Sequence, residues 1–506
     1  MTLARPGTDA ALSTLEAALA THEAEAHGLP DLLQVEVAPT PVAAPELLRL
    51  NRPLARQLGL DPEALETPEG VLLLAGSRVP SGVRPRALAY GGHQFGTWVP
   101  QLGDGRAVLL GQVIDREGVR RDVQLKGSGR TPFSRRGDGR AALGPVLREY
   151  IVSEAMAALG IPTTRALAAL TTGEPVVRQQ VEPGAVLVRV ASSHVRIGTF
   201  QYAQRTGDQE LLRQLADAVI ARHDPELGRC EQPYRALLDA VIERTASLVA
   251  RWMGVGFIHG VMNTDNLQVA GETLDYGPCA FMDTYHPATV YSSIDTWGRY
   301  AYDQQPRIAH WNLARLAEAL LPLLGEDEET ALEQAQAALD RYAGLFEAAH
   351  REIFLRKIGI ARPREGDEEQ VADLLRRMAE GRADFTLTFR QLAEAELPER
   401  AGPVRSRFQE PDAFDAWAEG WRKRLAREPG TPEARRDAMR RVNPAFIPRN
   451  HRVEQALEAA SRERDLRPLD ELMSVLALPY DDQPERAGYA QPPRPGEEVR
   501  QTFCGT

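Results

Sequence analysis

The stretch HGVMNTDNLQVAGETLD, residues 259–275, determines how the rest of the chain is interpreted. It places one histidine, two asparagines and two aspartates in seventeen residues, directly after a long apolar segment typical of a helix. Residues 267–269 and 273–274 predict two short strands joined by a turn in which Gly271 supplies the positive φ. Such a hairpin would bring Asn266, at its entrance, beside Asp275, at its exit.

Asn266 and Asp275 are therefore candidate metal ligands. Amide and carboxylate oxygens suit Mg²⁺ or Mn²⁺, which usually take one or two protein ligands and leave the remaining positions to water and phosphate. Asp265 stands next to this pair as a further carboxylate. The alternative is that these residues only cap a tight turn, which is commoner for any single one of them. Their convergence on one hairpin favours the metal site.

The spacing within this stretch also matches a known catalytic loop. The interval from His259 to Asn266 equals that of the protein-kinase sequence HRDxxxxN, and Asp275-Tyr276-Gly277 stands where the kinase DFG would follow. One position departs from the pattern, because Val261 falls where a kinase has its catalytic aspartate. The sequence thus predicts kinase-like nucleotide and metal binding without the usual base.

The composition limits the class of protein. A chain of 506 residues with 43% hydrophobic content can form one large or two to three ordinary domains. The net charge of −11 argues against a nucleic-acid partner, and three cysteines are too few for a disulfide framework. We expect no secretory or transit segment and no membrane partner, since no apolar run has membrane-spanning length. These features predict a cytoplasmic protein.

Lysine is rare, which draws attention to each one. Only three of the 60 basic residues are lysines, and two of them, Lys357 and Lys423, lie in arginine-containing helical stretches where either residue would serve. Lys126 instead ends an alternating strand, DVQLK, ahead of Gly127-Ser128-Gly129. A compact ammonium can contact phosphate where a planar guanidinium would not fit. Chance survival of one lysine is the alternative.

The region around Lys126 predicts antiparallel strands. A strand at 106–115, entered through Gly103-Asp104-Gly105, precedes the Lys126 strand, so the glycine turn and Lys126 should lie on neighbouring strands. We expect Gly103 and Gly105 to expose backbone N–H groups that can approach phosphate, with Arg106 close behind. Gly-Asp-Gly is also an ordinary hairpin turn, and its position relative to Lys126 favours the phosphate interpretation.

The following segment, GRTPFSRRGDGRAALG at 129–144, is basic and rich in glycine, and includes Asp138 and Gly139. It is typical either of an anion-binding loop or of a solvated flexible loop. Pro145 then predicts the start of a helix that ends at Gly160. A glutamate of this helix, Glu149 or Glu154, would pair with Lys126 or face solvent.

Farther along, Arg189 interrupts an otherwise apolar strand, where a charge must be paired or bind an anion. Beyond residue 200 the pattern becomes helical. The helices expected there are 209–222, 233–253, 311–322, 329–349, 367–380, 412–427, 432–441, 451–462 and 468–477. Two further helices are expected near the start of the chain, at 9–25 and 45–58.

A sheet with a glycine turn, a lysine strand and a helix glutamate, followed by a helical half with the Asn and Asp hairpin, is the layout of the protein-kinase-like fold. More closely, the chain resembles the selenoprotein O family of protein adenylyltransferases, atypical members of that fold. The resemblance rests on motifs at 90–107, 124–144, 148–167, 186–201 and 259–283, extended by AYDQQP at 301–306 and NPAFIPRN at 443–450.

This resemblance implies an α+β, two-lobed fold. We expect a β-rich N-lobe at 86–200 and a helical C-lobe at 201–350. A helical extension at 1–85 would precede them, and a helical C-terminal extension at 351–480 and a flexible tail at 481–506 would follow.

The resemblance also implies roles for individual residues. Lys126 and Glu149 would form the ion pair, Asp265 would be the general base, and Asn266 and Asp275 would hold Mg²⁺ or Mn²⁺. The nucleotide would be contacted by Gly103, Gly105, Arg106, Lys126, Asp138, Gly139, Arg189, Arg196 and Asp275.

The family binds ATP in a reversed orientation, so that AMP passes to a Ser, Thr or Tyr hydroxyl of a protein substrate and pyrophosphate leaves. UTP is an alternative donor. Arginines of the 129–144 loop, with Arg189 and Arg196, would bind the departing pyrophosphate. Family members also carry selenocysteine or cysteine near the C-terminus, where this chain has Cys504 next to Phe503. We expect a redox role for Cys504, with Cys230 and Cys279 as the available intramolecular partners.

Two other classes of function stay open at this point. A phosphotransferase is the first, and Val261 argues against it because the usual base is missing. A nucleotide-binding scaffold without turnover is the second. The set of Lys126, Asp265, Asn266 and Asp275 argues against the scaffold, which has little need of a metal site and a base.

Overall fold

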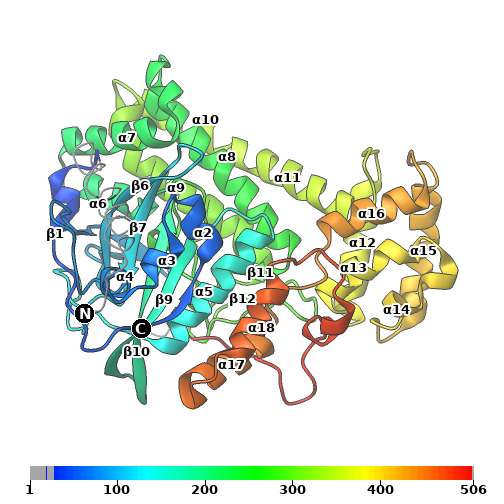
Figure 1. Cartoon of the computed structure of the whole chain (residues 1–506). Helices are drawn as coiled ribbons and strands as arrows, with labels where there is room; N and C mark the ends of the chain where they lie inside the picture. Colours follow the sequence, from blue (N-terminus) through cyan, green and yellow to red (C-terminus); the bar gives the residue numbers. More distant parts are fainter. Residues whose placement is uncertain (1–18, 20–27, 504–506) are drawn as a thin grey trace.

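The computed structural model describes residue 19 and residues 28–503. Its N-terminal part is rich in strands and its C-terminal part is helical (Figure 1). The main sheet ends at Ala191 and the first long run of helices begins at Ile197, so the predicted change of structure near residue 200 is confirmed. Among the described residues, no helix combines the length and the apolar character needed to cross a membrane.

One antiparallel sheet organises the N-terminal part. Its strands follow the order β1-β3-β6-β7-β10-β9-β2, with β8 pairing with β10. Their bounds are β1 Gln34–Glu36, β2 Glu46–Leu50, β3 Arg86–Leu88, β6 Ala107–Ile114, β7 Arg120–Lys126, β8 Ala141–Ala142, β9 Arg165–Val177 and β10 Val181–Ala191. Two separate pairs are β4 Gly92–Gln94 with β5 Thr97–Val99, and β11 Phe257–Ile258 with β12 Ala280–Phe281.

The pairing of β6 with β7 positions Lys126. Asp115 closes the turn between these strands, because its Oδ1 accepts hydrogen bonds from the backbone N–H of Glu117 and Val119, at 3.0 and 2.8 Å. In the resulting register Ala107 lies opposite Lys126. The prediction that the glycine turn before residue 106 and Lys126 occupy neighbouring strands is therefore confirmed.

The N-terminal segment differs from the prediction. The helix expected at 45–58 is wrong, because strand β2 pairs with β9 and only then does α2 (Arg52–Gln57) begin, with the Asn51 side chain as its cap. The segment 1–85 thus adds β1 and β2 to the sheet besides the short helices α3 (Pro62–Leu65) and α4 (Pro68–Leu74). Local propensity favoured a helix here, and pairing with β9 overrode it. The helix expected at 9–25 lies, apart from residue 19, outside the described residues.

Helix α5 (Leu143–Ala158) packs on β9 and β10 and starts two residues before the predicted Pro145. Its buried face has a helical spacing, with Leu147, Ile151 and Ala155 in the core. Gly160, at φ +75°, follows its end as the sequence predicts. This packing places the Glu149 side chain behind the sheet, facing Lys126.

The helical part differs from the prediction in several places, since α6 (Ile197–Arg205) and the short α14 (Gly402–Arg405) were not among the predicted helices. The helix expected at 329–349 is two helices, and Phe385–Ala395 forms a helix that the sequence reading missed because its FTLTF start resembles a strand. The observed bounds are α6 Ile197–Arg205, α7 Gln209–His223, α8 Pro233–Gly254, α9 Gln305–Leu324, α10 Glu328–Leu339, α11 Arg341–Lys357, α12 Asp367–Glu380, α13 Phe385–Ala395, α14 Gly402–Arg405, α15 Pro411–Leu425, α16 Pro432–Val442, α17 Asn450–Glu458 and α18 Arg467–Leu476.

The end of the chain returns to the N-terminal part. Helices α17 and α18 lie beside α5 and share one core with it (Figure 1). The Pro- and Gly-rich stretch that follows has little regular structure, yet Thr502 is buried and donates its backbone N–H to Tyr291 O at 2.8 Å and its Oγ1 hydroxyl to Pro278 O at 2.5 Å. The described part of the predicted flexible tail is thus held against the body.

Contrary to what the sequence suggested, Lys357 does not lie where lysine and arginine would serve equally. It is buried, and its Nζ lies 4.4 Å from the ring centre of Phe389 and 5.5 Å from that of Phe385. Burial lowers the pKa of this ammonium to about 7.

We expect Lys357→Met to raise the free energy of unfolding at neutral pH by about 1–3 kcal/mol, because the buried charge is removed and the volume is kept. The cost of Lys357 is largest below its folded pKa of about 7 and fades as the pH rises towards its ordinary value of 10.5. The gain should therefore shrink between these two values. Urea unfolding across this range tests both points, with exposed Lys423→Met as the control. A variant no more stable than the wild type at neutral pH would contradict the assignment.

Candidate active site

A cleft of about 790 Å³ lies between the sheet and the helical part. Its walls bring together residues that are far apart in the sequence, from the turn before β6 to the segment after β11. The predicted site residues that line it are Gly103, Gly105, Arg106, Lys126, Asp138, Gly139, Arg189, Arg196, Asp265, Asn266 and Asp275. Glu149 does not line the cleft and contacts Lys126 from behind.

Lys126 connects two carboxylates. Its Nζ donates to Glu149 Oε2 at 2.6 Å and to Asp275 Oδ1 at 3.1 Å. Of the two candidate glutamates, Glu149 is therefore the partner, whereas Glu154 binds the guanidinium of Arg165 at 2.7 Å. The helix turns these two side chains to different faces, since five residues separate them.

Two buried arginines complete an ionic cluster around Asp275. The Arg189 guanidinium donates to Glu149 Oε1 and, at 2.6 Å, to Asp275 Oδ1. Arg196 donates to Asp275 Oδ2 at 2.9 Å and lies over the ring of Tyr90, at 4.5 Å from its centre. Burial by itself raises the pKa of Asp275, but the three cations outweigh it and hold that pKa well below its ordinary value.

Arg189 and Arg196, which are expected to contact the nucleotide, line the cleft as members of this cluster. Both side chains are almost fully buried, at 2% exposure for Arg189 and 5% for Arg196, and both are already paired with carboxylates. The requirement that Arg189 be paired within its apolar strand is thus met by Glu149 and Asp275. The more exposed cations of the cleft belong to the loop at 129–144, where Arg130, Arg135 and Arg136 also line the wall.

Asp265 differs from Asp275 in its surroundings. Its Oδ2 accepts a long hydrogen bond from Gln94 Nε2, at 3.4 Å, and its buried Oδ1 has no hydrogen-bond partner among the described residues. Burial raises the pKa of this carboxyl to about 6, although Arg196 opposes the shift. A buried, weakly solvated carboxylate at the cleft wall is suited to taking up a proton.

The sequence reading missed the element that holds this carboxylate. The β4–β5 hairpin reaches across the cleft, where the backbone N–H of His93 donates to Thr264 Oγ1 at 2.7 Å and that of Phe95 donates to Asn263 Oδ1 at 3.0 Å. Phe95 and Gly96 both have positive φ at the tip of this hairpin. The glycine-rich YGGHQFG sequence could have predicted this hairpin, because glycines with positive φ are typical of tight turns.

The hairpin predicted for 267–274 is only partly formed. A single bridge joins Leu267 to Thr273, and both sides then pair with other segments. Gln268 bridges to Arg196, and Thr273 bonds with the backbone of 162–164. These outside partners, and not a longer strand pair, fix Asp275, which has a left-handed backbone at φ +62°.

The donor set of the predicted metal site fits a hard divalent cation. Asn266 uses its Nδ2 to donate to Val261 O at 3.0 Å, which leaves its amide oxygen as a ligand beside the carboxylates of Asp265 and Asp275. The unpartnered Oδ1 of Asp265 is a further oxygen of the same kind. Within the ranges that the structure describes, no three His, Cys, Asp or Glu side chains gather to hold a metal alone. Water and phosphate would have to complete the site.

The Gly-Asp-Gly turn works differently from the prediction. The backbone N–H of Gly103 donates to Tyr90 O and that of Gly105 to Gly103 O, so neither is open to a phosphate. A Cβ at Gly103 would lie 2.3 Å from the ring of Phe133, which shows that glycine is needed for the turn to pack under the 129–144 loop. Between them, buried Asp104 faces Arg196 at 3.7 Å.

Asp138 lines the cleft, whereas Arg148 supports it from outside. Asp138 pairs with Arg178 at 2.9 Å and thereby fixes the 129–144 loop to the β9–β10 turn. Arg148 had no predicted role, yet it is buried and donates to the carbonyl oxygens of Gly277 and Cys279, at 3.1 and 2.5 Å. Arg148 therefore holds the segment after Asp275. In the sequence, an arginine within the apolar pattern of α5 was the sign that this residue has a role.

Comparison with known proteins places the chain in a family. Residues 17–477 match the family described as protein adenylyltransferase SelO. The chain belongs to the SelO family. A relative named protein nucleotidyltransferase YdiU, from Methylorubrum populi, is 63% identical over 485 residues, which cover 94% of this chain and 97% of that protein. Proteins of the same name from Methylorubrum extorquens (strain PA1) and Bradyrhizobium sp. (strain ORS 278) are 64% and 63% identical, with the same coverage.

Membership of the SelO family confirms the predicted enzyme class, nucleotidyltransferase, and the predicted function at the level of the family. The cysteine prediction stays untested, since Cys504 lies outside the described residues. Of its two suggested partners, Cys230 is exposed, whereas Cys279 is buried and burial raises the pKa of its thiol to about 11.

Proposed function

We propose that this SelO-family chain transfers AMP from ATP to a Ser, Thr or Tyr hydroxyl of a protein substrate and releases pyrophosphate. The catalytic frame would be a protein-kinase-like fold, with residues 86–200 as its N-lobe and 201–350 as its C-lobe. The segments 1–85 and 351–480 would be extensions of this frame. Support comes from the cleft between the sheet and the helical part, from its lysine–glutamate–aspartate cluster, and from the family match.

One observation separates this reaction from phosphate transfer. The position of a kinase base is occupied by Val261, whose side chain can neither accept a proton nor orient a hydroxyl. The carboxylate with an unpartnered oxygen at the cleft wall is Asp265, four residues later. Asp265 would therefore take the proton of the acceptor hydroxyl, which would approach from the β4–β5 side.

The nucleotide would be bound through its phosphates. Lys126 and the exposed cations of the 129–144 loop are the groups that can meet them, while Arg189 and Arg196 would act mainly by fixing Asp275. Phosphate oxygens would compete with Asp275 for Lys126 and so free one lone pair of Asp275 Oδ1 for a metal, while Arg189 and Arg196 keep the carboxylate in place. Gly103, Gly105, Arg106, Asp138 and Gly139 would shape the same wall.

Asn266 and Asp275 would hold Mg²⁺ or Mn²⁺, with Asp265 close by. When bound, the metal would neutralise charge that develops on the phosphates during transfer. The chain's own part is to keep Asp275 ionised, which Lys126, Arg189 and Arg196 do through their contacts, and to keep Asp265 able to accept a proton.

Labelled ATP tests the proposal directly. With Mg²⁺ or Mn²⁺ and a protein acceptor, we expect label from the α-phosphate to enter protein and label from the γ-phosphate to appear as pyrophosphate. Asp265→Ala should lower α-label incorporation by about 10²-fold, as expected for loss of a general base. The exposed Asp303→Ala is the matched control. Incorporation of γ-label instead would establish a phosphotransferase, and no incorporation of either label would favour a binding scaffold. The same assay with labelled UTP compares the two donors.

A further inference from the structure

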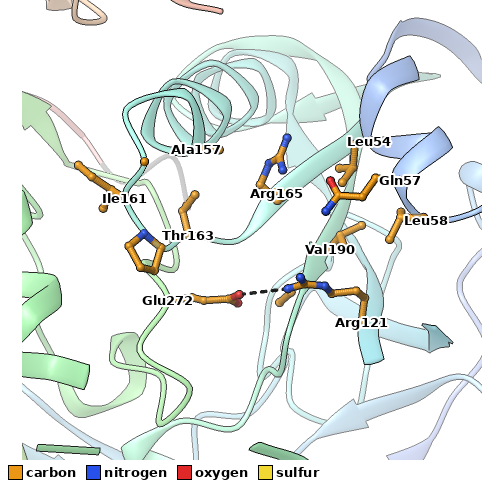
Figure 2. A pocket seen from close by; sticks show the side chains of 13 residues that line it. Leu54, Gln57, Leu58, Arg121, Ala157, Ile161, Thr163, Arg165, Val190 and Glu272 are labelled. Carbon is orange, nitrogen blue, oxygen red and sulfur yellow. Dashed lines mark ion pairs between the residues drawn. The ribbon is translucent and has the colours of Figure 1, made fainter. Parts of the chain in front are cut away.

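A second pocket, with a volume of about 290 Å³, shares no lining residue with the cleft. Helix α2, the end of α5, the connection 161–165, the start of β7 and the turn at Glu272 form its walls (Figure 2). None of its lining side chains is among the candidate catalytic, nucleotide-binding or metal-binding groups. Its size is at the lower end for small-ligand pockets and suits a molecule as large as an amino acid.

The pocket contains a basic side chain, Arg121, and an acidic one, Glu272, that do not form a close ion pair. Arg121 uses Nε to donate to Asp115 at 3.0 Å, while its Nη1 is 3.7 Å from Glu272 Oε1, too far for a hydrogen bond. Glu272 in turn accepts a hydrogen bond from the Ser192 backbone through its other oxygen, at 3.0 Å. Figure 2 shows the Arg121 and Glu272 side chains pointing toward each other, with Gln57 on another wall of the same pocket. A cationic and an anionic position thus lie side by side, each with bonding capacity left.

The rest of the lining is mainly apolar, apart from Arg165, whose guanidinium is already paired with Glu154 at 2.7 Å. Leu54, Leu58, Ile161 and Val190 contribute aliphatic side chains around the polar groups. Such a pocket selects a ligand that carries one negative group, one positive group and a short apolar body. A simple anion would meet the carboxylate of Glu272, and a simple amine would meet the guanidinium of Arg121.

We propose that this pocket is an effector site for a free α-amino acid with an aliphatic side chain. Its carboxylate would pair with Arg121 and the Gln57 amide, its ammonium with Glu272, and its side chain would lie against Leu54 and Leu58. No covalent step is involved.

The pocket is connected to the catalytic segment by direct bonds. Thr163, in its wall, hydrogen-bonds through Oγ1 with the hydroxyl of Tyr276, which follows Asp275. The backbones of Pro162 and Thr164 bond with Thr273 at 2.9 and 3.0 Å. Strand β7 carries Arg121 at its pocket end and Lys126 at its cleft end. A ligand that joins Arg121 to Glu272 therefore ties together the two segments that hold the catalytic cluster.

Binding is tested on the full chain by calorimetry and thermal unfolding with a panel of the standard amino acids. We expect L-leucine to bind, and leucinamide and 4-methylpentanoate, which lack the carboxylate and the ammonium, to bind at least about tenfold more weakly. Glu272→Gln keeps an oxygen that can accept the hydrogen bond from the Ser192 backbone, and it should weaken leucine binding by a similar factor. Gln57→Trp fills the pocket and should abolish binding, whereas Arg56→Trp, on the exposed side of the same helix, should not.

Two results would overturn the site: no amino acid binds at millimolar concentration, or leucine binds Gln57→Trp as well as the wild type. Equal binding of leucinamide or 4-methylpentanoate would overturn the zwitterionic ligand. The effect on the cleft rests on the proposed ATP site and is measured separately, as ATP affinity with and without leucine. Because coupling between sites is reciprocal, ATP must change leucine affinity by the same factor. If leucine does not change the ATP affinity, the effector role is wrong, but the proposed transferase activity is not affected by that result.

Discussion

Asp275→Asn is expected to lower metal-dependent nucleotide transfer by at least about 10³-fold. The substitution keeps the size of the side chain but removes the charge that a metal ligand needs, and charge neutralisation by a metal contributes several kcal/mol to such reactions. Asn266→Ala should be milder, because water can replace a neutral ligand. Transfer rates at several Mg²⁺ and Mn²⁺ concentrations measure both effects.

The same change should also affect stability, which the sequence did not suggest. Asp275 faces Lys126, Arg189 and Arg196. The variant leaves Lys126 and Arg189 with Glu149 as their remaining carboxylate, and Arg196 with Asp104 at 3.7 Å. Loss of a partner from a buried ionic cluster is destabilising. We therefore expect Asp275→Asn to have a lower melting temperature than the wild type when no ligand is bound. Asp303→Ala is the control and should change neither transfer nor melting temperature. Metal-dependent transfer that is unchanged in Asp275→Asn would refute the metal assignment.

Lys126→Arg, although conservative in charge, is expected to lower transfer by about 10³-fold. The Lys126 ammonium fits between Glu149 Oε2 and Asp275 Oδ1, while the guanidinium of Arg189 already contacts both of these carboxylates. A second planar guanidinium would crowd Arg189 and could not present a compact charge to phosphate. This crowding explains why position 126 keeps a lysine in a chain whose other basic residues are almost all arginines.

The measurement is the rate of α-label transfer at saturating ATP, together with ATP affinity from calorimetry. Lys423→Arg, at an exposed position paired with Glu419, is the matched control and should behave as the wild type. Near-normal transfer by Lys126→Arg would show that the position tolerates any cation.

Local patterns determined much of this protein. The strands around Lys126, the change to helices near residue 200 and most helix positions follow from periodicity and from turn residues, which act over a few neighbours. The candidate residues were also identified from the sequence, because Lys126, Asp265, Asn266 and Asp275 stand out by residue type and spacing. The structure then placed them in one cleft.

Only the tertiary structure decided which of these groups meet. It paired Lys126 with Glu149 and not Glu154, and it attached Thr273 to residues 162–164 where a hairpin was expected. It also buried Lys357 against two phenylalanine rings. The partners in these contacts lie from about twenty to more than a hundred residues apart in the chain. Their contacts follow from how sheet and helices pack, which no local pattern in the sequence encodes.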